Sequence, residues 1–185
     1  MKIFISWAGY SKDLALAIHK FVPDASMNIL ETWVSADVKC LPQGPGFPAK
    51  ILEAVRDCDV CLVILTEQSI KNWWVNFEVG TFYGMGKPVF GLLCGTVTYE
   101  LLQGKGHPLG ANGTSFTSPT ANSLSDLFIS ILNGNYGPIG KMPPTNEQIV
   151  RNVEGCFGRF QSAYQAMIES PDRSISEILS EVQED

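Results

Sequence analysis

Trp74 and Glu78 are the pair of side chains in this sequence whose types and spacing best suit chemistry. They lie four residues apart in a segment that is expected to be helical, so they share one helix face. An aromatic ring can stack on a planar base, and a carboxylate beside it can stabilise the positive charge that develops as a glycosidic bond breaks. Taken alone, the spacing more often describes a solvated glutamate on an amphipathic helix whose tryptophans pack in the core.

The short segment Ser6–Ser11 follows an apolar run and precedes a helical pattern. Free N–H groups at such a helix start can accept a phosphate, and we expect Ser11 to be the N-cap. The segment matches neither a dinucleotide-binding fingerprint nor a P-loop. An ordinary capped turn is therefore the favoured interpretation of these residues alone.

The remaining nucleophilic and metal-binding residue types predict no further chemistry. Cys58 and Cys61 form a CxxC pair where a helix should end and a strand begin, which favours buried structural cysteines over a redox pair. His19 and His107 stand at no metal-ligand spacing, so we expect no metal. No nucleophile elbow accompanies the serine, histidine and aspartate residues.

Strand and helix patterns alternate through the first half of the chain. Apolar runs predict strands, and amphipathic patterns predict helices that begin near Ser11, Pro48 and Trp73. The expected strands are 3–7, 30–35, 60–65 and 88–93. This alternation predicts a flavodoxin-like, doubly wound parallel sheet in the α/β class, with ligands bound at the carboxyl ends of the strands.

The second half of the chain is less regular. Residues 95–123 are rich in Gly, Thr, Ser, Pro and Asn and are expected to be mostly loop, whereas 124–132 should be helical. Capping boxes at Thr145–Gln148 and Ser174–Glu177 predict a long amphipathic helix and a short one. The expected organisation is a first domain over 1–133 and a C-terminal helical extension over 134–185.

Composition excludes several classes of protein. The chain has 185 residues, 45% hydrophobic and 17% charged, with a net charge of −6, which fits one globular domain with an appendage and not a non-specific nucleic-acid binder. No apolar run is long enough to span a membrane, and the first residues do not resemble a signal peptide. Five cysteines without a tight framework favour a reducing cytoplasm.

In combination, four motifs resemble a Toll/interleukin-1 receptor (TIR) domain of the bacterial type. They occur in the family's order: Lys2–Ser6, then Trp33–Val38 with Pro42 and Gly44, then Val63–Thr66, then Trp74–Gly80. The resemblance covers residues 2–95 and is expected to continue to 133. The resemblance changes the interpretation of Glu78 from a solvated glutamate to a catalytic one, because the segment that Trp74–Gly80 resembles carries the catalytic glutamate in NAD-consuming members.

The resemblance implies an NAD⁺ glycohydrolase or ADP-ribosyl cyclase that cleaves the nicotinamide–ribose bond, with NAD⁺ as substrate and no cofactor. Glu78 would be catalytic, Trp74 would shape the pocket, and a loop rich in Pro and Gly would gate it. The other residues expected to contact substrate are Ser6, Trp7, Ser35 and Asp37. Standalone proteins of this kind produce a nucleotide signal in anti-phage systems such as Thoeris, where a separate effector protein reads it. A homo-oligomer through TIR–TIR contacts is also expected.

Three alternatives stay open. Some TIR domains are non-catalytic interaction modules, and the receptor-type Arg-Asp-x-x-Pro-Gly signature is replaced here by Asp37–Gly44. A nucleoside deoxyribosyltransferase is a related α/β protein that also uses a carboxylate, although the Trp-rich helix fits it less well. The third alternative is an enzyme that stays latent until a partner orders its oligomer.

Overall fold

The computed structural model describes residues 1–35, 47–104, 107–111, 114–137, 139 and 142–169. Its strands are β1 (Lys2–Ser6), β2 (Glu31–Val34), β3 (Val60–Leu65), β4 (Val89–Leu93) and β5 (Ser115–Thr117). Its α-helices are α1 (Lys12–Ala25), α2 (Phe47–Asp57), α3 (Trp73–Gly84), α4 (Tyr99–Gly104), α5 (Pro108–Ala111), α6 (Ala121–Asn133) and α7 (Asn146–Glu169). Two 3-10 turns, Gly9–Ser11 and Ser69–Lys71, precede α1 and α3.

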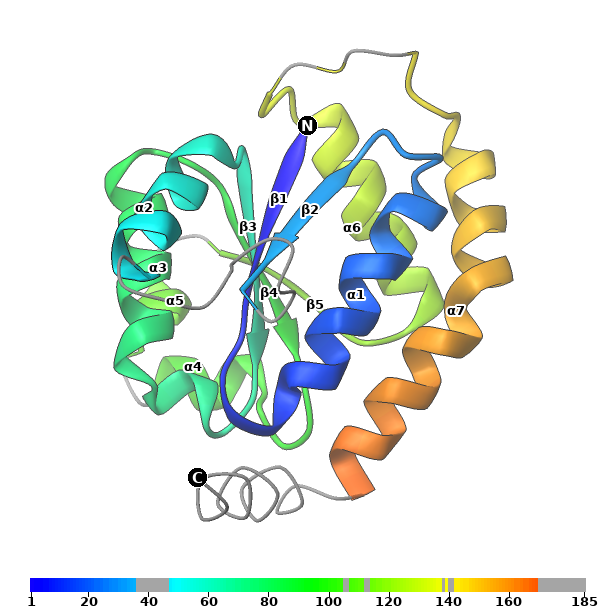
Figure 1. Cartoon of the computed structure of the whole chain (residues 1–185). Coiled ribbons are helices and arrows are strands. Elements are labelled where there is room, and N and C mark those ends of the chain that lie inside the picture. The colour runs from blue at the N-terminus through cyan, green and yellow to red at the C-terminus, as the bar shows by residue number, and fades with distance from the viewer. Residues whose placement is uncertain (36–46, 105–106, 112–113, 138, 140–141, 170–185) are drawn as a thin grey trace, which may run out of the picture.

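The five strands form one parallel sheet in the order β2-β1-β3-β4-β5, with helices on both of its faces (Figure 1). β3 is buried along its whole length, as expected for an unbroken apolar run in the middle of a covered parallel sheet. The chain crosses from β1 outward to β2, returns to β3 and continues outward to β5. This order confirms the predicted flavodoxin-like, doubly wound fold.

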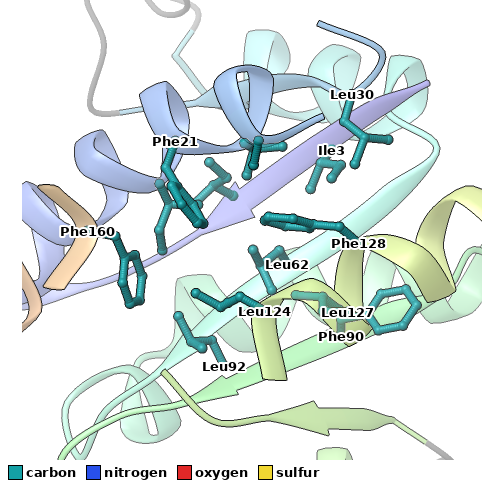
Figure 2. Close-up of a cluster of buried hydrophobic side chains, with 14 of the residues drawn as sticks. Ile3, Phe21, Leu30, Leu62, Phe90, Leu92, Leu124, Leu127, Phe128 and Phe160 are labelled. Atoms are coloured by element: carbon teal, nitrogen blue, oxygen red, sulfur yellow. The ribbon is translucent and has the colours of Figure 1, made fainter. Parts of the chain in front are cut away.

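Each face of the sheet has its own hydrophobic cluster, because successive side chains of a strand point to opposite faces. Ile3 and Ile5 of β1 pack toward α1, α6 and α7, in the cluster drawn in Figure 2. Phe4 points the other way, toward α2 and α3, and contacts Trp33 and Phe82 at ring-centroid distances of 4.8 and 5.5 Å. The next residue on this second face is Ser6.

The expectation that residues 95–123 are mostly loop was wrong, because this segment contains α4, α5 and β5. These elements are only three to six residues long, too short to show a hydrophobic period. They are held by tertiary contacts: β5 pairs with β4, and Leu102 and Leu109 are buried under the second face.

Two helix caps were predicted within the described residues, and one of them forms as expected. Thr145 and Gln148 form the predicted capping box, in which each backbone N–H donates to the other residue's side chain. Ser11 stands at the N-cap position of α1, but its hydroxyl donates to the Ala8 carbonyl at 2.8 Å and does not cap the helix. The box predicted at Ser174–Glu177 lies outside the described residues.

α7 packs along α1 and α6 on the first face of the sheet (Figure 1). Its buried side chains repeat along one stripe, as the amphipathic pattern predicts. They are Ile149, Val153, Phe160 and Met167. Phe160 is fully buried, with its ring 5.5 Å from that of Phe21 in α1. None of the helices in the described ranges is long and apolar enough to cross a bilayer.

We expect Phe160→Ala to destabilise the whole chain by roughly 3–5 kcal/mol, because it empties a fully buried site shared by α7 and α1. Urea unfolding followed by circular dichroism would measure the change, with Met142→Ala, a side chain 93% exposed, as the control. An unchanged midpoint in Phe160→Ala would show that α7 adds nothing to the stability of the sheet.

Candidate active site

Glu78 occupies a core position of α3. The side chains that α3 buries against the sheet follow a helical stripe, on which a carboxylate is the exception. They are Val75, Glu78, Val79 and Phe82. The helix is fixed at its start by Asn72, whose side-chain oxygen accepts the N–H groups of Trp74 and Val75 at 2.9 and 3.1 Å.

Ser6, the last residue of β1, supplies the direct partner of this carboxylate. Its hydroxyl donates to Glu78 Oε2 at 2.5 Å, the length of a charge-assisted hydrogen bond. Ser6 is 1% exposed and Glu78 is 3% exposed, so the contact is shielded from solvent. Ser6 follows Phe4 on the face that α3 covers, which is why it reaches a residue that is distant in the sequence.

Burial is the main influence on the acidity of Glu78. Loss of hydration raises the pKa of this carboxyl from 4.5 to about 7, while hydrogen bonds from the side chains of Ser6 and Trp74 oppose the rise. The Trp74 ring, half-buried, lies one helical turn before Glu78. A carboxyl with this pKa is present in both protonation states at neutral pH, a property common at functional sites.

Trp7 and Ser35 form a second pair at the same edge of the sheet. The Trp7 indole N–H donates to the Ser35 hydroxyl at 3.0 Å, and the ring packs against the hydrophobic cluster of the first face. The structure therefore divides the predicted residues between two contacts, Ser6 and Trp74 around Glu78, and Trp7 with Ser35. Asp37 and the expected gating loop lie outside the described residues.

Gln68 holds the loop that follows β1. Its Oε1 accepts the Tyr10 N–H at 3.4 Å and lies over Gly9, where a Cβ would come within 1.6 Å of it. Gly9 also has a φ of +61°, a backbone conformation that favours glycine, whereas the Gln68 side chain could move away from an added Cβ. Sequence reasoning did not single out Gln68, because a contact between two loops leaves no periodic signal.

Cys58 and Cys61 are buried and unpaired, as predicted. Burial raises the pKa of the Cys58 thiol to about 12 and that of Cys61 well above its usual value, so neither is a ready nucleophile. Within the described ranges, no three His, Cys, Asp or Glu side chains gather as metal ligands would.

Three cavities formed by described residues lie elsewhere, and Glu78 lines none of them. One of about 280 Å³ lies between β5 and α6, and one of about 340 Å³ lies between α1 and α7. The third, of about 440 Å³, lies beside the start of β2. The distinctive feature around Glu78 is therefore its buried hydrogen bond.

This geometry suits the stabilisation of a developing cation. An ionised Glu78 in a site poor in water would interact strongly with a positive charge on a ribose ring. The raised pKa also shows that ionisation here is costly without such a cation. Proton transfer near neutral pH is the second possible role of the group.

We expect Glu78→Gln to become more stable relative to the wild type as pH rises from 5 to 8. In the unfolded chain the carboxyl ionises near pH 4.5, but in the folded chain only near 7, so folding stability falls between these values. The difference between these two pKa values corresponds to a loss of roughly 3 kcal/mol in the free energy of unfolding. Urea unfolding at both pH values measures it, and Glu154→Gln on the exposed side of α7 controls for the loss of one carboxyl. A constant difference between wild type and Glu78→Gln would contradict the raised pKa.

Comparison with known proteins gives a family match over more than half of the chain. The family model described as "TIR domain" matches residues 3–106. A TIR domain of the Toll-related receptor TRR-2 from Hydra magnipapillata is similar in structure, at 14% identity and a TM-score of 0.47, over 72% of this chain and 96% of that one. A conserved protein from Enterococcus faecalis V583 shows 14% identity and a TM-score of 0.40, over 84% and 98%. No curated protein matches the chain.

Proposed function

The chain belongs to the TIR domain family, and we propose that it is one of the members that cleave NAD⁺ at the nicotinamide–ribose bond. The observation that carries the proposal is the buried contact between Ser6 and Glu78 at the carboxyl edge of a parallel sheet. That edge is where open α/β sheets bind ligands. Glu78 also lies in the segment that resembles the glutamate-bearing segment of NAD-consuming TIR domains.

In the proposed reaction, the bond between ribose C1′ and the nicotinamide nitrogen breaks, and its electron pair leaves with nicotinamide as the neutral base. The ribose becomes an oxocarbenium-like cation, which the ionised Glu78 stabilises. Water then adds to C1′ and loses a proton, which gives ADP-ribose. If the adenine or a ribose hydroxyl of the same molecule attacks instead, the product is a cyclic isomer, and exclusion of water favours that outcome.

Glu78 is only 3% exposed, so the side chains around it must rearrange before a ribose can reach it. Trp74 is the half-buried side chain that hydrogen-bonds to it from the same helix and is the expected moving part. TIR domains commonly self-associate, and we propose that association helps to complete the pocket. A role in anti-phage defence, with a separate effector that reads the product, would follow from this activity.

We expect Glu78→Gln to lose nicotinamide release by about 10²–10⁴-fold, because the neutral amide keeps the shape of the side chain but not its charge. Concentrated protein is incubated with NAD⁺, and the products are resolved by chromatography and mass spectrometry. Glu154→Gln is the matched control, since it makes the same change on an exposed face of α7. A product at the mass of ADP-ribose identifies a hydrolase, and one lighter by one water identifies a cyclase.

Equal release from wild type and Glu78→Gln would exclude this mechanism. If the wild type releases no nicotinamide at high concentration, even with lysate from infected cells, and shows no base exchange on deoxynucleosides, the result favours an interaction module. Base exchange on deoxynucleosides without cleavage of NAD⁺ would identify a deoxyribosyltransferase.

We expect Ser6→Ala to move the acid limb of the pH–activity profile to higher pH. The Ser6 hydroxyl stabilises the ionised form of Glu78, and its loss raises the pKa of that carboxyl further. The measurement is kcat/KM for NAD⁺ between pH 5 and 9. A uniform loss at every pH, with the limb unmoved, would assign Ser6 a purely structural role.

A further inference from the structure

α7 lies beyond the part of the chain that the family model matches. That match covers residues 3–106, whereas α7 spans Asn146–Glu169, so the family assigns no role to its side chains. The helix packs along α1 and α6, and its C-terminal end lies at the edge of the sheet where the parallel strands end (Figure 1). Ser6 meets Glu78 at the same edge. α7 therefore brings residues from outside the family match to the edge that carries the candidate site.

Tyr164 connects α7 to this edge. Its hydroxyl oxygen accepts the N–H of Gly95 at 3.4 Å, two residues after the end of β4. Its ring lies parallel to that of the fully buried Phe160, with 4° between the planes and 6.3 Å between the centroids. One end of the side chain is thus held by a backbone and the other by the core. Both contacts fix the plane of a ring that is only partly buried.

The loop that Tyr164 meets is itself held in place. The Cys94 N–H donates to the last carbonyl of β3 at 2.9 Å, and the Thr96 hydroxyl donates to Glu67 Oε1 at 2.5 Å. These bonds tie the loop to the end of β3 on both sides of Gly95. Gly95 has a φ of +64°, and a Cβ placed on it would meet nothing within 4 Å. The space over Gly95 is therefore open, and the surfaces that border it are fixed before any ligand arrives.

The position of Tyr164 suits the second base of a dinucleotide. The strand order β2-β1-β3-β4-β5 changes direction between β1 and β3, and sheets of this kind bind nucleotides at that point. Ser6 ends β1, and Gly95 follows β4, which is two strands away or about 10 Å at the usual spacing. An extended dinucleotide spans more than this distance, because two riboses and a diphosphate separate its bases. With its nicotinamide riboside at Glu78, its other base would reach the end of β4.

Charge selects a base over a phosphate as the group that fits beside Tyr164. The Glu67 carboxylate is bonded to Thr96, the residue after Gly95, so a phosphate at this loop would meet a like charge. Adenine is uncharged at neutral pH and offers a flat π-face. The tyrosine ring, also uncharged, offers a matching face.

We propose that Tyr164 binds the adenine of NAD⁺ by stacking, so that α7 supplies part of the site for the adenosine half of the substrate. This role rests on NAD⁺ as the ligand and deepens the proposed function. Truncation of an aromatic side chain that stacks on a base weakens binding by about tenfold. A ring whose plane is already fixed loses little conformational freedom when a base packs on it, which favours binding.

Binding of adenosine monophosphate tests the stacking contact without any turnover. We expect wild type to bind it in an NMR titration, and Tyr164→Leu to weaken the binding by about tenfold, because leucine keeps the packing on Phe160 but has no π-face. Tyr164→Phe keeps the ring and should bind more tightly than Tyr164→Leu. Tyr136→Leu is the matched control, since Tyr136 is 39% exposed and contacts Phe90 near the start of β4. Circular dichroism confirms that each variant is folded.

Cleavage kinetics show whether the bound base helps the reaction. Nicotinamide mononucleotide has the same bond between nicotinamide and ribose as NAD⁺ but no adenosine. We expect wild type to prefer NAD⁺ in kcat/KM, and Tyr164→Leu to lose about tenfold of that preference through KM for NAD⁺. A side chain that only supports the fold would change the cleavage of both substrates alike.

The proposal is overturned if folded Tyr164→Leu binds adenosine monophosphate as tightly as wild type, or if wild type does not bind it up to about 10 mM. It is also overturned if ribose 5-phosphate binds as tightly as adenosine monophosphate, because the base then contributes nothing. Equal losses toward NAD⁺ and nicotinamide mononucleotide in Tyr164→Leu would assign Tyr164 a structural role. A wild type that binds adenosine monophosphate through Tyr164 but releases no nicotinamide would contradict only the proposed cleavage, so the two proposals fail separately.

Discussion

The burial of one carboxyl group against one hydroxyl is the constraint on which the site depends. Inside the protein, Glu78 accepts a hydrogen bond from the Ser6 hydroxyl at 2.5 Å and a further one from the Trp74 side chain. Both contacts need fixed backbones, which the buried β1 strand and the Asn72-capped start of α3 provide. Even so, burial raises the pKa to about 7, which shows that these bonds offset the loss of hydration only in part.

The first four strands of the sheet could be predicted because the local sequence of each one is typical of a buried strand. The run Val60–Leu65 has the composition of a strand covered on both faces, and the helices between the strands repeat with a clear period. β5 could not be predicted in this way. It has three residues, Ser115–Thr117, and exists because β4 offers it a hydrogen-bonding edge, a contact that the sequence of the segment does not encode.

The residues of the candidate site could be predicted from the sequence, but the contacts between them could not. Trp74 and Glu78 lie on one helix, so their proximity follows from spacing alone. The partnership of Ser6 with Glu78 joins residues 72 positions apart, and the pairing of Trp7 with Ser35 likewise depends on how the loops after β1 and β2 meet. Sequence reasoning gave Ser6 a contact with substrate, which stays a prediction, but it did not foresee the contact of its hydroxyl with Glu78. A contact set by tertiary packing has no signature in the local pattern.

α3 departs from the usual pattern of a surface helix in two ways. Its buried stripe is apolar at Val75, Val79 and Phe82 but also carries Glu78, so burial removes the hydration of one carboxyl group. Its outer side leaves the rings of Trp73 and Phe77 exposed, which forgoes part of the hydrophobic gain that their burial would give. The cost at Glu78 is offset when a cation reaches the ionised carboxylate. Trp74 joins the two sides of the helix, because its side chain hydrogen-bonds to Glu78 and its ring contacts those of Trp73 and Phe77.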